Sequence, residues 1–378
     1  MNKVQLKAMI TRSLRKQGYY IRNGRILPPA RLNKATLRKL HTTAVKHQIR
    51  ISRDGLHELE ADLLERIADG PDITPAAIQP RLVEVAPGSA DELLFRYARL
   101  HWSIPVSAGY GRRLRFLVID QNNEKLIGLF GLSDPVFNLG ARDSWIGWTP
   151  DARRLRLSHV MDAYVLGAVP PYSQLLCGKL VALLATSNEV REAFRRKYVA
   201  SSSRIRRKIT DARLALLTTS SALGRSSLYN RLRYANRLVY QSVGFTQGTG
   251  EFHFANGQYD HLREYASRYC EPTERKFRWG KGFRNRREVI RKCLSKIGLS
   301  KQWLSHGVGR EVFVMPLASN VREFLKGDHS RLRWYDQSAD ALMSHFRERW
   351  LLPRSIRNTE YESWNRDEWR LWPRQNSR

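Results

Sequence analysis

The sequence predicts a mixed α/β protein built around one mixed sheet. Two apolar runs, LRFLVID at 114–120 and KLIGLFGLSD at 125–134, flank the polar tetrapeptide QNNE and predict an antiparallel hairpin. Later strands alternate with helical segments, which is typical of such a sheet. The 378 residues, 42% of them hydrophobic, can bury a sizeable core in about two domains. The later strands are predicted at 159–169, 214–219 and 239–245.

Residues 1–70 predict a small basic N-terminal helical lobe. In YYIRNGRIL, at 19–27, Asn23-Gly24 separates two short apolar runs and favours a hairpin turn, because both central residues take positive φ. Helices are predicted at 31–48 and at about 55–68. This lobe could be a DNA-binding head, although its helices lack helix-turn-helix spacing. PDITPAAIQP, at 71–80, is broken by prolines and predicts a linker.

Residues 80–255 form the predicted core domain. Pro170-Pro171 removes two ladder donors and should end the strand at 159–169. Further elements are predicted as helices at 89–102, from about Ser173 and at 226–232, and as short strands at 145–148 and 251–254.

Residues 256–378 predict a basic C-terminal extension, helical and rich in Trp and Arg, packed on the core. Helices are expected at 261–270 and 283–299, and a strand at 311–318. One face of the second helix carries the apolar residues Val289, Ile290, Cys293, Leu294 and Ile297.

Charge is the main functional signal. Lys and Arg number 66 against 35 acids, a net charge of +31, and the first acid is Asp54. Such an excess favours a polyanionic partner, nucleic acid first and an acidic membrane surface second. A solvated basic surface or an acidic protein partner is the alternative. A second dense basic patch lies at 191–208, and we expect it to contact phosphates through Arg195, Arg196, Lys197, Arg204, Arg206, Arg207 and Lys208.

Several classes of protein are excluded by missing patterns. No run of about 18 apolar residues predicts a membrane span, and no apolar core follows the basic N-terminus, so we expect a cytoplasmic protein. The sequence has no GxxxxGK[ST], HExxH or paired CxxC motif. We expect no metal site, because three scattered cysteines do not suit zinc and nothing in the spacing of the acids indicates a metal; a nuclease carboxylate cluster is the alternative. The residues concerned are Cys177, Cys270, Cys293, Asp120, Asp134, Asp143 and Asp162.

VLGAVPPYSQLLCGKLVALL, at 165–184, places a strand before a helix whose first turns carry Cys177-Gly178. Small residues let a ligand or strand approach the helix backbone, and free N–H groups suit a phosphate. This order resembles the GNAT N-acetyltransferase fold, whose fourth strand and following helix hold acetyl-CoA. The resemblance implies acyl-CoA as a cofactor, bound by Val169, Gln174, Cys177, Gly178 and Lys179. That fold's Arg/Gln-x-x-Gly-x-Gly/Ala pattern has Cys177 and Lys179 in place of its glycines here, and helix–sheet packing without a cofactor is the alternative.

TTSSALGRSSLYNRL, at 218–232, combines hydroxyls, a Gly-Arg corner and Tyr229. The same resemblance gives Tyr229 the role of the acid that protonates the leaving thiolate, which a phenol can do. Alternatively, Tyr229 belongs to the core and Ser226 caps a helix. Arg225 either binds phosphate or stays solvated.

RDSWIGW, at 142–148, offers an arginine, a carboxylate and two tryptophans. Asp143 is a candidate general base, or it holds Arg142 in position. Arg142 and Trp148 could contact bases or phosphates, since aromatics beside arginines stack on bases, or they could fill a core. We expect a central cleft around Asp143, Trp148, Tyr172, Arg225 and Tyr229.

Residues 75–325 resemble the DruA family of Druantia anti-phage defence proteins. The matching stretches are GRRLRFLVID, KLIGLFGLSDPVFNL, RDSWIGW, VMDAYVLGAVPPYSQLLCGKLVALL, TTSSALGRSSLYNRL, SVGFTQGTGEFHF and HGVGREVFVMPLASN; CGK replaces the expected Gly-Gly-Lys. The resemblance implies defence alongside other Druantia proteins, including a helicase-like component. The favoured function is nucleic-acid binding, with DNA preferred to RNA. The alternative is a group-transfer enzyme of acetyltransferase-like fold that modifies DNA bases or a protein.

Overall fold

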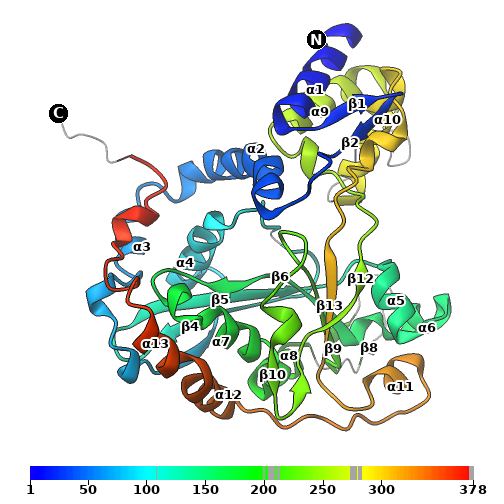
Figure 1. Ribbon diagram of the computed structural model, residues 1–378. Helices are drawn as coiled ribbons and strands as arrows, with labels where there is room; N and C mark the ends of the chain where they lie inside the picture. The colour runs from blue at the N-terminus through cyan, green and yellow to red at the C-terminus, as the bar shows by residue number, and fades with distance from the viewer. Residues whose placement is uncertain are drawn as a thin grey trace.

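The centre of the computed structural model is a seven-stranded mixed sheet (Figure 1). The structure describes residues 1–107, 109–198, 201–202, 209–210, 213–272, 279 and 283–373. The strands lie in the order β12 (Gln241–Phe245), β13 (Glu311–Pro316), β9 (Leu216–Ser220), β6 (Val160–Ala168), β5 (Lys125–Ser133), β4 (Arg113–Asp120) and β3 (Pro80–Glu84). Only β6 and β9 pair in parallel within this sheet. The predicted mixed α/β architecture is confirmed.

The β4–β5 hairpin forms as predicted because its strands are apolar on both faces. Leu114 and Phe116 belong to one buried cluster, whereas Leu117 and Ile119 belong to another on the opposite face. A strand covered on both sides has no solvated face, and its sequence therefore reads as a continuous apolar run.

Helices cover both faces of the sheet. On one face α7 (Cys177–Leu184) and α12 (Ala339–Phe346) bury a shared apolar cluster with the sheet. On the other face α4 (Ala90–Ala98) covers the β3–β5 side, and α5 (Gly140–Ile146) and α11 (Val321–Lys326) cover the β9–β13 side. No helix within the described ranges has the length and apolar character needed to cross a membrane.

A separate helical unit stands at the end of the sheet near β12 and β13 (Figure 1). We call residues 1–53 and 254–308 the lobe, because they share one apolar cluster. Its elements are α1 (Lys3–Gln17), β1 (Tyr20–Arg22), β2 (Arg25–Leu27), α2 (Lys34–Ser52), α9 (Gln258–Tyr269) and α10 (Phe283–Lys296). The Asn23-Gly24 hairpin forms as predicted, with φ of 49° and 68°, and the five predicted apolar residues of α10 are all buried.

Several short elements differ from the sequence predictions. Residues 145–148 end the helix α5 instead of forming a strand, since Gly147 supplies its left-handed cap with φ of 82°. The predicted strand at 251–254 is a 3-10 turn, Phe252–Phe254, and the helix at 226–232 shrinks to the turn Tyr229–Arg231. Segments of four to seven residues with only a few apolar side chains fit either state, and tertiary packing decides between them.

The remaining elements complete the chain. The second predicted N-terminal helix shortens to α3 (Glu60–Leu64). The further helices are α6 (Pro150–Arg156), α8 (Asn188–Tyr198) and α13 (Leu352–Arg357). Short ladders pair β7 (Ser201–Ser202) with β8 (Ile209–Thr210) and β10 (Arg233–Tyr234) with β11 (Arg237–Leu238).

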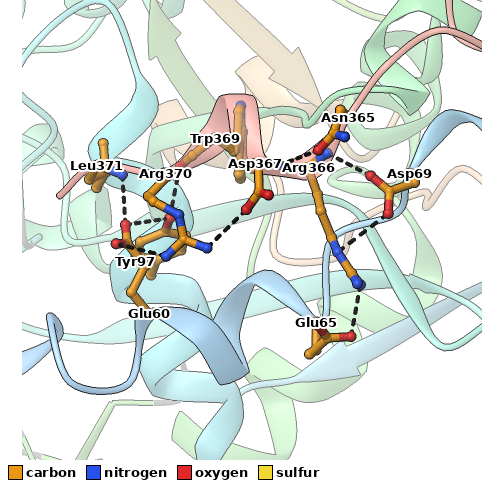
Figure 2. Close-up of polar contacts among 10 residues, drawn as sticks. All are labelled: Glu60, Glu65, Asp69, Tyr97, Asn365, Arg366, Asp367, Trp369, Arg370 and Leu371. Atoms are coloured by element: carbon orange, nitrogen blue, oxygen red, sulfur yellow. Dashed lines mark hydrogen bonds and ion pairs between the residues drawn. The ribbon is translucent and has the colours of Figure 1, made fainter. Parts of the chain in front are cut away.

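The C-terminal segment is fastened to α3 and α4 by buried polar contacts (Figure 2). Glu60, only 3% exposed, accepts hydrogen bonds from the Tyr97 hydroxyl at 3.0 Å and the Leu371 N–H at 2.6 Å. Arg370 Nη1 lies 3.7 Å from the same carboxylate. Nearby, Arg366 forms ion pairs with Glu65 and Asp69.

Replacing Glu60 should therefore loosen this segment. We expect Glu60→Ala to lower the free energy of unfolding by about 2 kcal/mol, because the part-buried Leu371 N–H loses its acceptor and Arg370 loses its buried partner, while the Tyr97 hydroxyl keeps the Trp369 carbonyl oxygen. Urea denaturation measures the loss. The control Glu65→Ala removes a carboxylate that is 63% exposed and should cost under about 1 kcal/mol. Equal losses in the two variants would contradict the buried role of Glu60.

Candidate nucleic-acid interface

The N-terminal part of the lobe carries an uncompensated positive charge. Residues 1–53 contain fourteen Lys and Arg and no acid, and all fourteen side chains are exposed. Across the described part of the chain, none of them forms an ion pair with a carboxylate. They are Lys3, Lys7, Arg12, Arg15, Lys16, Arg22, Arg25, Arg31, Lys34, Arg38, Lys39, Lys46, Arg50 and Arg53.

Helix α2 arranges four of these cations in a row. Lys34, Arg38, Lys46 and Arg50 lie at four-residue spacing, with exposed Thr42 between them, and because each step of four turns by about 40° the row runs obliquely around the solvent-facing side of the helix. At 1.5 Å per residue the row extends over about 24 Å. The opposite face buries Leu37, Leu40, His41 and Ala44 against the lobe, which fixes the cations toward solvent.

The second predicted basic patch is partly neutralised. Arg195, Arg196 and Lys197 are exposed at the end of α8. However, Arg196 Nη2 lies 2.5 Å and Lys197 Nζ 3.7 Å from the carboxylate of Glu84. The other four predicted residues, Arg204, Arg206, Arg207 and Lys208, lie outside the described residues.

The prediction that Arg142 contacts nucleic acid is contradicted by its burial. Its side chain is 0% exposed and donates to the carbonyl oxygens of Val136 at 2.9 Å and Phe137 at 3.1 Å. It also pairs with Asp143, whose other oxygen lies 3.1 Å from Arg153. Burial lowers the pKa of Arg142, and Asp143 opposes that shift. The pair holds the loop before α5 in place, which is the structural alternative considered for Asp143.

Trp148 also packs inside the protein, between α5 and α11. Its indole nitrogen donates to the carbonyl oxygen of Leu325 at 2.7 Å, and the Arg142 guanidinium lies 5.3 Å from its ring centre. These contacts tie α5 to α11 and leave the ring against the apolar cluster there.

The predicted central cleft does not form, because the sheet separates its members. Tyr172 and Tyr229 pack with the cluster under α7, whereas Trp148 packs with the cluster under α5 and α11. Tyr229 stacks on Tyr240 at 4.6 Å, and burial raises its pKa to about 12. Arg225 is exposed. Asp143 and Tyr229 thus cannot act on one reacting group without a rearrangement of the sheet.

The residues predicted to hold acyl-CoA do not fit that cofactor in this arrangement. Val169 and Cys177 are fully buried, and a Cβ on Gly178 would lie 3.4 Å from the Leu228 side chain. Residues of the C-terminal extension contact the remaining two predicted residues, Gln174 and Lys179. Arg354 Nε donates to the carbonyl oxygen of Gln174 at 3.0 Å, and Lys179 Nζ lies 4.5 Å from the Trp350 ring centre.

The dispersed acids stay apart in the fold. Asp134 pairs with Arg112, Asp162 accepts from Thr218, and Asp120 accepts from Tyr172. Within the described ranges no group of three or more His, Cys, Asp or Glu side chains could hold a metal ion.

A buried histidine cluster that the sequence reasoning missed joins the lobe to the sheet. The rings of His41 in α2 and Phe252 lie tilted to one another with their centres 4.1 Å apart, and the Phe252 and His306 ring centres are 4.5 Å apart. Arg310 Nη2 lies 3.4 Å from His41 Nε2. Burial, reinforced by Arg310, lowers the pKa of His41 to about 3, and burial lowers those of His306 and His253 to about 3 and 4. The stretches GEFHF and HGVGR could have given the signal, because each combines a histidine with a nearby glycine: Gly250 lies three residues before His253, and Gly307 follows His306 directly.

Fold and surface together define a mixed α/β protein with a cationic helical lobe. The family model described as Druantia protein DruA matches residues 31–327. The chain is 38% identical over 369 residues to Druantia protein DruA of Escherichia coli (strain UMEA 4076-1), covering 96% of this chain and 90% of that relative. The chain therefore belongs to the DruA family, a component of Druantia anti-phage defence, as its sequence predicted. No solved structure matches it.

Proposed function

We propose that this chain is the component of Druantia defence that binds nucleic acid, with DNA preferred, through the cations of residues 1–53. The carrying observation is that all fourteen cations there are exposed and lack carboxylate partners in the described chain. Cations of the sheet domain are often engaged, as Arg112 is with Asp134 and Arg142 with Asp143. Free cations release counterions on binding a polyanion, and that release supplies the affinity.

The row on α2 suits a nucleic-acid backbone. Its span of about 24 Å equals about seven nucleotide steps along one strand at 3.4 Å each. Contacts of this kind position the partner without reading its sequence. We therefore propose that binding has little base specificity. The proposal also places the protein in the cytoplasm and gives it other Druantia proteins as partners, a helicase-like one among them.

The salt dependence of binding tests the proposal. With the four α2 cations on phosphates, the logarithm of the association constant should fall with a slope of about −3.6 against the logarithm of salt concentration. Fluorescence anisotropy with a labelled 30-mer duplex should show about a 100-fold loss between about 50 and 200 mM salt. Absence of binding at the lower salt, or a flat response, would contradict the proposal and favour an acidic protein partner.

An acetyltransferase-like core is a second element of the proposal. The order of elements supports it: β6 is the fourth strand of the main sheet along the chain and is followed by α7, while β9 is followed by the turn with Tyr229. The covering of Gln174 and Lys179 by Arg354 and Trp350 speaks against acyl-CoA transfer in this state. We therefore favour this core as a scaffold for the lobe, with group transfer as the lesser candidate.

A further inference from the structure

A cavity of about 290 Å³ lies on the α4 side of the sheet. It is lined by Glu92, Phe95, Arg96 and Arg99 of the α4 region and by Arg115 and Tyr164 of β4 and β6. Three arginines and one carboxylate thus line it, and the Arg96 side chain is exposed to solvent. Glu92 is already bound to Arg115 and to the Gly88 N–H, so it cannot balance the other two arginines.

Tyr164 is directed into this cavity by the backbone around it. It is the extra residue of a bulge, where Gly131 pairs with Val165 and Leu132 with Ala163. A Cβ on Gly131 would come within 2.5 Å of the Tyr164 hydroxyl, and one on Gly109 within 3.0 Å of its ring. Because Gly131 and Gly109 have no side chain, the phenol of Tyr164 has space to lie against them.

Two buried donors beside the cavity have no acceptor in the described chain. The Tyr164 hydroxyl and Arg99 Nε are both buried and donate no hydrogen bond there, although Arg115 contributes a side-chain hydrogen bond to the Tyr164 hydroxyl and Arg99 Nη1 donates to the Ser107 carbonyl oxygen at 3.0 Å. Burial lowers the pKa of Arg99, and the neighbouring Arg115, Arg96 and Arg113 lower it further, while Tyr164 raises it. Buried donors normally find partners, and because two of the three arginines here have no carboxylate partner in the described chain, an anionic acceptor suits this cavity.

We propose that this cavity binds the phosphate of a nucleotide, either free or at the 5′ end of a DNA strand. A phosphate monoester carries close to two negative charges and three acceptor oxygens, matching the two unbalanced guanidiniums and the two idle donors. The site shares no residue with the lobe, so this inference stands or falls separately from binding through α2.

Calorimetric titration of the full-length chain with inorganic phosphate and with AMP tests the proposal. We expect Arg99→Gln to weaken AMP binding by about tenfold or more, since a hydrogen bond to a charged group is lost. Tyr164→Phe removes one oxygen, keeps the ring and should weaken AMP binding by at least about threefold. Arg154→Gln, an exposed arginine of α6, is the matched control and should bind like the wild type. If Arg99→Gln fails to fold by thermal melting, Tyr164→Phe carries the test.

Oligonucleotides with and without a 5′ phosphate distinguish the two sources. Tighter binding of the phosphorylated strand that disappears in Tyr164→Phe identifies a DNA end. AMP binding without that difference identifies a free nucleotide. The proposal is overturned if neither phosphate nor AMP binds the wild type, or if all four proteins bind AMP equally.

Discussion

Reversing three cations of the α2 row is expected to weaken DNA binding by at least about 100-fold and to reduce the salt slope by about three. The variant carries Lys34→Glu, Arg38→Glu and Lys46→Glu. All three side chains are exposed on the solvent-facing side of the helix, so the change removes phosphate contacts and adds repulsion without disturbing the buried face. Anisotropy titrations over a series of salt concentrations measure both quantities.

The matched control reverses three exposed arginines of the sheet domain, Arg154, Arg331 and Arg333. Each reversal changes the charge by two, so both triple variants go from +31 to +25. We expect the control to lose less than about threefold, because its charges lie outside the interface and are screened beyond about 10 Å. Equal losses in the two variants would mean that net charge alone drives binding and that α2 has no special part.

Acidification is expected to unfold the protein between about pH 5.5 and 4. Burial lowers the pKa of four buried histidines to about 3 or 4. They are His41, His159, His253 and His306. In the unfolded chain these groups titrate near 6.5, so the unfolded state binds more protons as the pH falls. Stability is therefore complete above about pH 6.5 and is lost on acidification, at about 1.4 kcal/mol per histidine per pH unit. Four such groups remove about 5 kcal/mol per unit, comparable to a typical total stability.

The measurement is the melting temperature from about pH 7.5 down to about pH 4. It should begin to fall near the ordinary histidine pKa of about 6.5. His41→Phe keeps an aromatic ring against Phe252 and removes one titrating group, so its pH dependence should be shallower. His329→Gln changes an exposed histidine and should follow the wild type. A melting temperature that stays level down to about pH 5 would show that these histidines are protonated in the folded state.

The sequence predicted the elements whose patterns are long or carry specific turn chemistry. The β4–β5 hairpin, the Asn23-Gly24 turn and the apolar face of α10 were all confirmed, because each depends on neighbouring residues alone. Residues 145–148 were predicted wrongly, since a few apolar residues take their conformation from what they pack against.

The candidate site was less accessible to sequence reasoning. Arg142 looks available for phosphate in the sequence, and only the fold shows its guanidinium enclosed by Asp143 and two carbonyl oxygens. The Glu84 partner of Arg196 lies more than a hundred residues away, so the partial neutralisation of that patch could not be foreseen. The free charge of residues 1–53 was predictable, because a segment without acids cannot neutralise itself.

The division of the lobe between residues 1–53 and 254–308 has a consequence during synthesis. The ribosome releases α1 and α2 first, but α9 and α10, which cover their apolar faces, emerge only about two hundred residues later. At about 5 to 20 residues per second, this interval lasts roughly ten seconds or more. During this interval the nascent chain exposes an amphipathic, strongly cationic segment whose apolar face has no partner to pack against. This segment is therefore where a chaperone would be needed first.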